Sequence, residues 1–130
     1  ETYKEQDKVL MLCEAFMKAK MTMLSDRINN RFKKVKFRLF QNQINGGVAE
    51  DCEVMIPSPN GDMVPYTHAN HGAKVNAGLE IISVLSDAWN LSLPLFIDNA
   101  ESVTNINLPT VQTIQLIVSE PDKTLRFEFV

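Results

Sequence analysis

The sequence predicts an α/β fold with a long N-terminal helix, an antiparallel hairpin, and a buried, parallel-type sheet against which a second helix packs. Three observations predict this fold. Apolar residues recur at helical spacing through residues 3–30, they alternate with charged residues in two short runs, and they then fill two continuous runs after a second helical pattern. Alternation is typical of half-buried strands, and continuous apolar runs indicate strands covered on both faces.

Composition limits the class of protein. The chain has 130 residues, of which 45% are hydrophobic, enough for a compact domain with a core. The formal net charge of −3 does not require a nucleic-acid partner. Two cysteines, Cys13 and Cys52, cannot form a disulfide framework and favour a reducing, cytoplasmic setting. No apolar stretch predicts a membrane span. Because the chain starts at Glu1 without methionine, we expect a piece of a longer protein.

Residues 3–30 contain neither Gly nor Pro and are predicted to form one amphipathic helix. The apolar positions repeat every seven residues in two registers: Val9, Phe16 and Met23, and Leu10, Met17 and Leu24. Such a repeat is typical of a coiled coil. We therefore interpret residues 1–30 as the end of a coiled coil that continues upstream, and residues 31–130 as a single compact domain.

Two alternating runs predict a hairpin. Residues 34–39 carry basic side chains on their polar face, whereas residues 51–56 carry acidic ones. Antiparallel pairing across residues 43–47 would place these charges opposite each other, and each ion pair would contribute at most about 1 kcal/mol. The hairpin ends in a turn at residues 57–61, where Asn60 and Gly61 are expected to supply positive φ angles.

The second half of the chain predicts a helix followed by strands. A polar loop at residues 66–72 leads into a helix at residues 73–89. Continuous apolar runs at residues 93–97 and 113–118 predict two strands buried on both faces, and alternation at residues 124–130 predicts a last strand. In open α/β sheets, ligands bind at the C-terminal ends of the strands, where the polar residues of this sheet gather.

Asp98 follows the first of these apolar runs directly. An apolar strand that delivers an Asp to its C-terminal end matches the Walker B arrangement, in which the carboxylate holds Mg²⁺ and a neighbouring residue orients the attacking water. A carboxylate in this position also commonly caps the following turn. The local pattern by itself leaves both interpretations open.

The order of elements carries more information than any one motif. A heptad helix is followed by a basic and acidic hairpin, a polar loop ending in Gly, a long helix, a buried strand with a terminal Asp, and a second buried strand. This order, from Val9 through Glu120, resembles the C-terminal lobe of the ATPase head in SMC and SbcC-type proteins. These are the ABC-like ATPases of chromosome maintenance and double-strand-break repair, and the resemblance implies a bacterial or phage parent protein that acts in DNA repair or recombination.

The resemblance implies a set of ligands and partners. ATP and Mg²⁺ would be bound between two heads in a head-to-head homodimer, and each head would need its own N-terminal P-loop lobe. DNA would be a further partner, and the resemblance leaves open whether a nuclease subunit takes part. No G-x-x-x-x-G-K-[ST] sequence occurs in the chain, so the chain alone is not expected to hydrolyse ATP.

The resemblance also implies a nucleotide-binding loop. In that family a Leu-Ser-Gly-Gly type signature motif precedes the long helix and touches the γ-phosphate of the nucleotide on the opposite subunit. The matching positions here retain only Gly72, because Asn70 replaces the Ser and His71 replaces the first Gly. An Asn side chain can still donate a hydrogen bond, and a helix N-terminus still favours an anion.

Catalytic positions carried over from the family differ in chemistry. Asn99 stands where the family has a water-polarising Glu, and an amide positions water without accepting its proton. Glu101, two residues further on, is a candidate for that role. Glu120 occupies the place of the switch His, where a carboxylate would repel a γ-phosphate. We expect either slow hydrolysis or a site used for nucleotide-gated binding.

Alternative interpretations remain. The chain could be a non-catalytic α/β interaction module that dimerises or binds a partner through its long helix. Residues 33–38 could bind DNA, because they mix basic and aromatic side chains, although a half-buried strand has the same pattern. His68 and His71 could bind a metal, but no third ligand is near in sequence, so solvent exposure or packing within the loop is the favoured interpretation.

Overall fold

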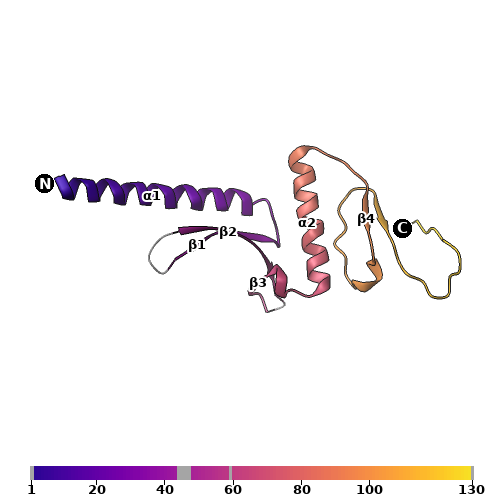
Figure 1. The fold of residues 1–130 in the computed structure, drawn as a ribbon. Coiled ribbons are helices and arrows are strands. Elements are labelled where there is room, and N and C mark those ends of the chain that lie inside the picture. The colour runs from indigo at the N-terminus through magenta and orange to yellow at the C-terminus, as the bar shows by residue number, and fades with distance from the viewer. Residues whose placement is uncertain (1, 44–47, 59, 130) are drawn as a thin grey trace. The chain divides into compact units, whose positions relative to one another are not determined.

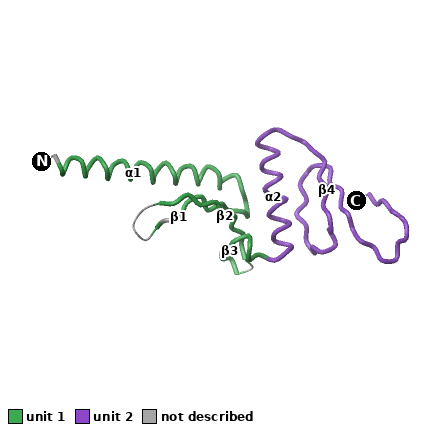
Figure 2. The backbone as a smooth tube through the Cα atoms, in the orientation of Figure 1, with its two compact units in different colours: residues 1–69 green, residues 70–130 purple. Residues whose placement is uncertain are grey.

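The computed structural model describes residues 2–43, 48–58 and 60–129. The chain divides into two compact units, residues 1–69 (unit 1) and residues 70–130 (unit 2), shown in Figure 2. The boundary expected after residue 30 lies inside unit 1, because the end of the first helix packs against the hairpin that follows it. Each unit combines helix and sheet, as the α/β fold class predicts.

Unit 1 is a long helix with a three-stranded sheet. Its elements are α1 (Thr2–Asn29), β1 (Lys36–Asn42), β2 (Val48–Pro57), β3 (Met63–Pro65) and the short 3-10 helix η1 (Tyr66–His68) (Figure 1). The strands pair antiparallel in the order β1-β2-β3. The helix and the hairpin are confirmed, whereas the three residues of β3 give too short a pattern to predict.

Only part of each predicted turn in unit 1 is described. Residues 44–47 of the connection between β1 and β2, and residue 59 of the turn after β2, lie outside the described residues. Gly61 takes a φ of 90°, as expected for the turn, whereas the φ of Asn60 depends on residue 59 and lies outside the described residues. Glycine adopts this left-handed conformation at no steric cost.

The expected cross-strand ion pairs are present. Arg38 of β1 lies opposite Glu53 of β2, and its Nε donates to Asp51 Oδ2 at 2.8 Å while Nη2 donates to Glu53 Oε2. The hydrogen bond to Asp51 is the largest cause of a raised pKa for Arg38, so the guanidinium keeps its charge across the working pH range. These ion pairs are exposed and contribute little to the stability of unit 1, so their main effect is to favour the observed register of β1 against β2.

Asn29 joins the end of α1 to β1. Its Nδ2 donates to the Phe37 carbonyl at 2.9 Å, and its Oδ1 accepts from the Phe37 N–H at 2.7 Å. Lys36 Nζ donates to the carbonyl of Asn29, the last residue of the helix, and to that of Phe32 in the turn that follows. The end of α1 and the first residues of β1 are therefore held together.

The core of unit 1 is small and centred on Val35. Val35 is fully buried, Phe32 and Ile56 are nearly so, and the Phe32 and Phe37 rings pack with centroids 5.0 Å apart. The sharp turn between α1 and β1 carries Phe32 and Val35 into this core.

We expect Val35→Ala to lower the free energy of unfolding of unit 1 by roughly 2 kcal/mol, because it removes fully buried methyl groups and leaves a cavity. Urea denaturation followed by circular dichroism measures the change. Val118→Ala is the matched control, because Val118 is exposed. Equal effects of the two substitutions would contradict the assignment of the core.

Unit 2 contains a helix packed on a parallel pair of strands. Its elements are α2 (His71–Trp89), β4 (Leu95–Ile97), the 3-10 helix η2 (Ala100–Ser102) and β5 (Thr113–Gln115). The pairing of β4 and β5 is parallel, with Phe96 opposite Ile114. Leu79 of α2 packs with Ile97 and Ala100 to form the core.

The expectation that the strand at residues 93–97 is buried on both faces is wrong. Within β4, Ile97 is buried but Phe96 is 63% exposed. Helix α2 covers one face of the pair, and the described residues provide no second layer. Parallel strands usually have cover on both faces, whereas the described residues cover one face of β4 and β5.

The C-terminal strands are also shorter than expected. β5 ends at Gln115 rather than at residue 118, and residues 124–129 form no strand, contrary to the prediction for residues 124–130. Leu125 and Phe127 are exposed. The alternating pattern is suited to a strand, but a strand requires a neighbour to accept its hydrogen bonds, and the described residues provide none there.

No helix within the described parts of the chain combines the length and the hydropathy that crossing a membrane requires.

Candidate functional site

The first part of the candidate site is the N-terminus of α2. The helix begins at His71, two residues before the predicted start, with Asn70 as its N-cap. Asn70 Oδ1 accepts from the Ala73 N–H at 2.8 Å, which is the usual bond of a capping side chain. The cap uses only the oxygen of the amide. The predicted role for Asn70, donation from Nδ2 to an anion, is therefore compatible with its structural role.

Gly72 brings this N-terminus to the end of β4. A Cβ placed on Gly72 would lie 3.5 Å from Cγ1 of Val103, the residue that follows η2. Helix α2 and strand β4 run in opposite directions (Figure 1). The predicted phosphate-binding residues and the residues that follow β4 therefore gather at the same end of unit 2.

Asp98 begins a tight turn after β4. Its side chain is exposed, and Oδ1 accepts from the Asn99 N–H at 2.9 Å. Asn99 has a φ of 55°, a left-handed conformation that Asn tolerates better than most residues. The Asn99 carbonyl accepts from both the N–H and the hydroxyl of Ser102. Oδ1 of Asp98 therefore bonds within its own turn, as the capping interpretation predicts, whereas Oδ2 takes no part in this bond.

The turn is fastened to β5 by backbone hydrogen bonds. Leu116 N–H donates to the Ile97 carbonyl at 2.8 Å, and Ala100 N–H donates to the Leu116 carbonyl at 3.1 Å. Ala100 is buried in the core of unit 2. The backbone on both sides of Asp98 and Asn99 is therefore anchored, while their side chains project to solvent.

The remaining predicted residues are less closely associated. Glu101 lies in η2 with its side chain exposed, three residues after Asp98. Glu120 is exposed in the segment after β5, and no described contact joins it to the Asp98 turn. The structure thus places Asn70, Gly72 and Asp98 at one end of unit 2, and among the described residues no hydrogen bond or ion pair joins Glu120 to them.

The alternative sites have structural explanations. Lys36 and Arg38 of the basic run are engaged with carbonyls and carboxylates of unit 1, as expected for a half-buried strand. Among the described residues, no group of three His, Cys, Asp or Glu side chains is arranged to hold a metal ion, so His68 and His71 lack a third ligand.

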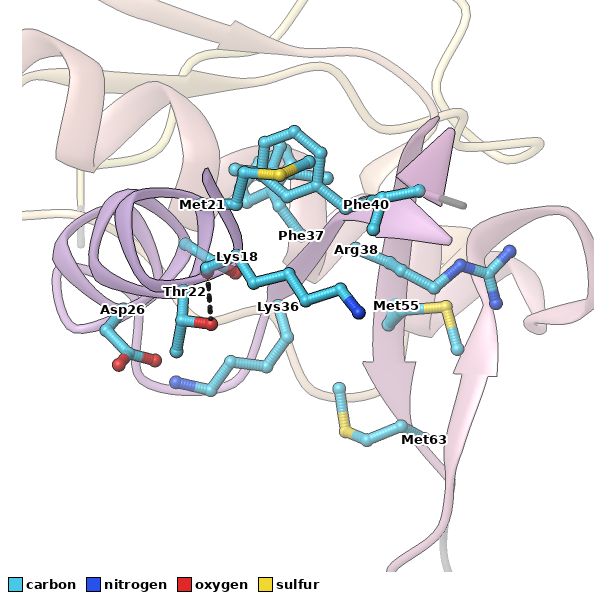
Figure 3. Close-up of a pocket in the computed structure, with 13 residues that line it drawn as sticks. Lys18, Met21, Thr22, Asp26, Lys36, Phe37, Arg38, Phe40, Met55 and Met63 are labelled. Carbon is cyan, nitrogen blue, oxygen red and sulfur yellow. Dashed lines mark hydrogen bonds between the residues drawn. The ribbon is translucent and has the colours of Figure 1, made fainter. Parts of the chain in front are cut away.

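A groove of about 560 Å³ lies in unit 1 between α1 and the hairpin (Figure 3). Met21 and Lys18 of α1 face Phe40 and Met55 of the sheet across it. None of the predicted site residues lines this groove. Its mixture of apolar and basic side chains does not define a ligand.

The apolar face of α1 predicted from the heptad repeat is exposed. Phe16 is 69% exposed, and a shallow depression is lined by five residues, which we call the α1 stripe: Val9, Leu12, Cys13, Phe16 and Met17. Ser25, which lines the groove beside the hairpin, lies nine positions after Phe16 and hence roughly 180° around the helix. Helix α1 therefore packs on its own sheet with a different face, and its heptad face remains uncovered among the described residues.

One positioning residue was not predicted. Asn76 of α2 bonds through both amide atoms to the backbone of the loop between η2 and β5. The only sequence signal is an Asn, which favours helices weakly, at an interior position of a helix between Val75 and Leu79. The partner loop lies about 30 positions away along the chain, so no local pattern identifies this contact.

Comparison with protein-family models, curated proteins and solved structures finds no match to this chain.

Proposed function

We propose that the chain is the C-terminal lobe of an SMC/SbcC-like ATPase head that acts in DNA repair or recombination. One observation carries the proposal: the N-terminus of α2 and the Asp98 turn lie at the same end of unit 2, joined by the contact between Gly72 and Val103. A helix N-terminus favours phosphate oxygens, and a carboxylate at a strand end favours Mg²⁺. In this proposal each head therefore supplies one part of each of two shared sites: Asp98 to the site of its own nucleotide, and the start of α2 to the site of the second head's nucleotide.

Each residue has a distinct role in this proposal. Asp98 would hold Mg²⁺ through the oxygen that does not cap its own turn. Asn70 Nδ2 and the first N–H groups of α2 would face the γ-phosphate of a nucleotide bound to a second head. Asn99 and Glu101 would orient water, with Glu101 as the only one of the two able to accept a proton. Mg²⁺ would neutralise charge on the phosphates.

The incomplete sheet supports a requirement for a second lobe. The pair β4–β5 has an exposed apolar residue, Phe96, on the face opposite α2. The exposed residues Leu125 and Phe127 alternate as in a strand without a neighbour. An N-terminal lobe carrying the P-loop would supply both the missing sheet and the missing phosphate cradle. In this proposal the chain does not hydrolyse ATP without that lobe.

Gly72 and Gly78 provide a matched test of the nucleotide loop. Both lie in α2, and an Ala Cβ fits at each: it would make an ordinary contact at Gly72 and meets nothing within 4 Å at Gly78. Because Gly disfavours a helix, we expect each Gly→Ala substitution to stabilise the chain by up to about 1 kcal/mol, measured by thermal denaturation. Only Gly72→Ala should weaken ATP-dependent association of heads in the complete protein, since only Gly72 lies where phosphate would approach.

Equal ATP-dependent association of the two variants would argue against a phosphate contact at Gly72. Loss of stability in Gly72→Ala would show that the fold, rather than a ligand, requires this glycine. The pair thus separates a structural role from a ligand-binding role within one helix.

A second candidate function is favoured by the α1 stripe. A non-catalytic module that dimerises or binds a partner helix would need an exposed apolar helix face, and the stripe is one. Such a module would not need Asp98. In the ATPase proposal the same stripe is the seam of the coiled coil. The two functions differ in whether association of the protein depends on ATP.

A further inference from the structure

Asn76 forms a two-point clamp between α2 and the loop that follows η2. Its Nδ2 donates to the Asn105 carbonyl at 2.8 Å, and its Oδ1 accepts from the Asn107 N–H at 2.7 Å. The amide thereby imitates a residue of a neighbouring strand, which donates and accepts in the same way. This loop thus has a hydrogen-bonded neighbour although it is not part of a sheet.

The clamp is one of three attachments of the same loop to α2. Val103 lies against Gly72 in the first turn, and Ile106, between the two clamped backbone groups, packs on the core formed by Leu79 and its neighbours. The three attachments span residues 103–107 on the loop and residues 72–79 on the helix. These attachments hold the loop against the N-terminal half of α2.

The loop is connected directly to the Asp98 turn. Val103 N–H donates to the Ala100 carbonyl, and Ser102 donates to the Asn99 carbonyl through both its N–H and its hydroxyl. Within the part of the chain that the structure describes, the Asp98 side chain bonds only to the next N–H. The direction of its carboxylate depends on the backbone that follows, and that backbone is tied to α2 through the loop.

We infer that Asn76 is a positioning residue that couples the N-terminal half of α2 to the Asp98 turn. The role of this coupling rests on the proposed function, in which α2 faces a phosphate and the Asp98 carboxylate binds magnesium. It explains why an amide with both a donor and an acceptor stands at a helix position where Ala would favour the helix more. A shift of α2 on contact with a second head would be transmitted to Asp98.

Hydrogen exchange of the 130-residue chain tests the clamp without nucleotide. In Asn76→Ala, we expect exchange of the Asn107 N–H to accelerate about tenfold and exchange of the Ser102 and Val103 N–H groups to accelerate several-fold. The Leu116 N–H, which bonds within the strand pair, should be unchanged. Ser83→Ala, a polar substitution further along α2, is the control and should alter none of these rates.

A second variant asks whether the amide geometry matters. Asn76→Asp retains the acceptor for Asn107 but, when ionised, places an oxygen against the Asn105 carbonyl. We expect protection of the loop to be lost at neutral pH and to return below about pH 4, where the protonated carboxyl can donate again. A merely space-filling role for Asn76 would show no such pH dependence, so equal protection at both pH values overturns the inference.

The outcomes separate the clamp from the proposed function. If exchange accelerates at the Asn107 N–H alone, with the Ser102 and Val103 rates unchanged, the coupling to the Asp98 turn is overturned. An equal increase in the exchange rates of all these groups, including the Leu116 N–H, also overturns it. If the exchange results are as expected, the Mg²⁺ concentration for half-maximal ATP hydrolysis by the complete protein should rise at least threefold in Asn76→Ala. Absence of magnesium-dependent hydrolysis even in the unsubstituted protein would overturn the proposed function while leaving the clamp supported.

Discussion

Under the proposed function, replacing Asp98 with Asn is expected to lower magnesium-dependent ATP hydrolysis by the complete protein about a hundredfold or more, while leaving the folded chain intact. The amide oxygen of Asn can still accept from the Asn99 N–H, so the turn that Asp98 caps is preserved. The negative charge that would hold Mg²⁺ is lost, and metal ions commonly supply several kcal/mol of transition-state stabilisation. The measurement is the rate of phosphate release at saturating ATP, together with the melting temperature of the chain.

Controls make the Asp98 result specific. Asp87→Asn changes an exposed Asp near the C-terminal end of α2 and should not alter the rate, while the melting temperature should stay the same or rise slightly because a negative charge is removed from the helix C-terminus. Asp98→Ala should lose the same activity and also some stability, because it removes the turn cap. Hydrolysis that is unaffected by Asp98→Asn would reject the Walker B role and would leave the non-catalytic module as the better explanation.

The second large effect is expected at the α1 stripe. We expect the chain to self-associate through this stripe and Phe16→Asp to raise the dissociation constant about 30- to 100-fold. Burial of a Phe side chain is worth roughly 1.5–3 kcal/mol, and a carboxylate on a buried seam adds a desolvation cost. Because Phe16 is exposed in the chain and lies away from the hairpin, the stability of unit 1 should not change. Sedimentation velocity over a concentration series measures the association.

Glu14→Ala is the matched control for the stripe, since Glu14 is exposed on the polar face of the same helix. It should leave the dissociation constant within about twofold of the original, because an exposed charge contributes little. A chain that stays monomeric at every accessible concentration, with or without Phe16→Asp, would contradict self-association through this face.

Local patterns account for the elements that were predicted correctly. Helix α1 follows from a long run of helix-forming residues without Gly or Pro, and the β1–β2 hairpin follows from alternation with opposite charges on the two strands. Asn70 and Asn90 bracket α2 as N-cap and left-handed C-cap. In each case the free energy that selects the structure comes from residues close in sequence.

The wrong predictions concern burial and strand length. An apolar run such as residues 93–97 indicates a strand, but the presence of a second covering layer depends on other parts of the protein. Residues 124–129 have the alternation of a strand and no partner among the described residues. Sequence pattern reports what a segment is suited to, whereas strand formation also requires a neighbour that satisfies its backbone.

For the candidate site, the sequence by itself determined the residue types: a carboxylate after an apolar strand, and an amide and a glycine at the start of a helix. Only the tertiary structure decided that these groups meet at one end of unit 2, that Glu120 is not joined to them, and that Asn76 ties the intervening loop to the helix. The physical reason is the distance along the chain over which each interaction acts. Capping and periodicity act within a few residues, but the approach of α2 to the Asp98 turn depends on packing between segments about 30 residues apart, which a single sequence does not encode in any local pattern.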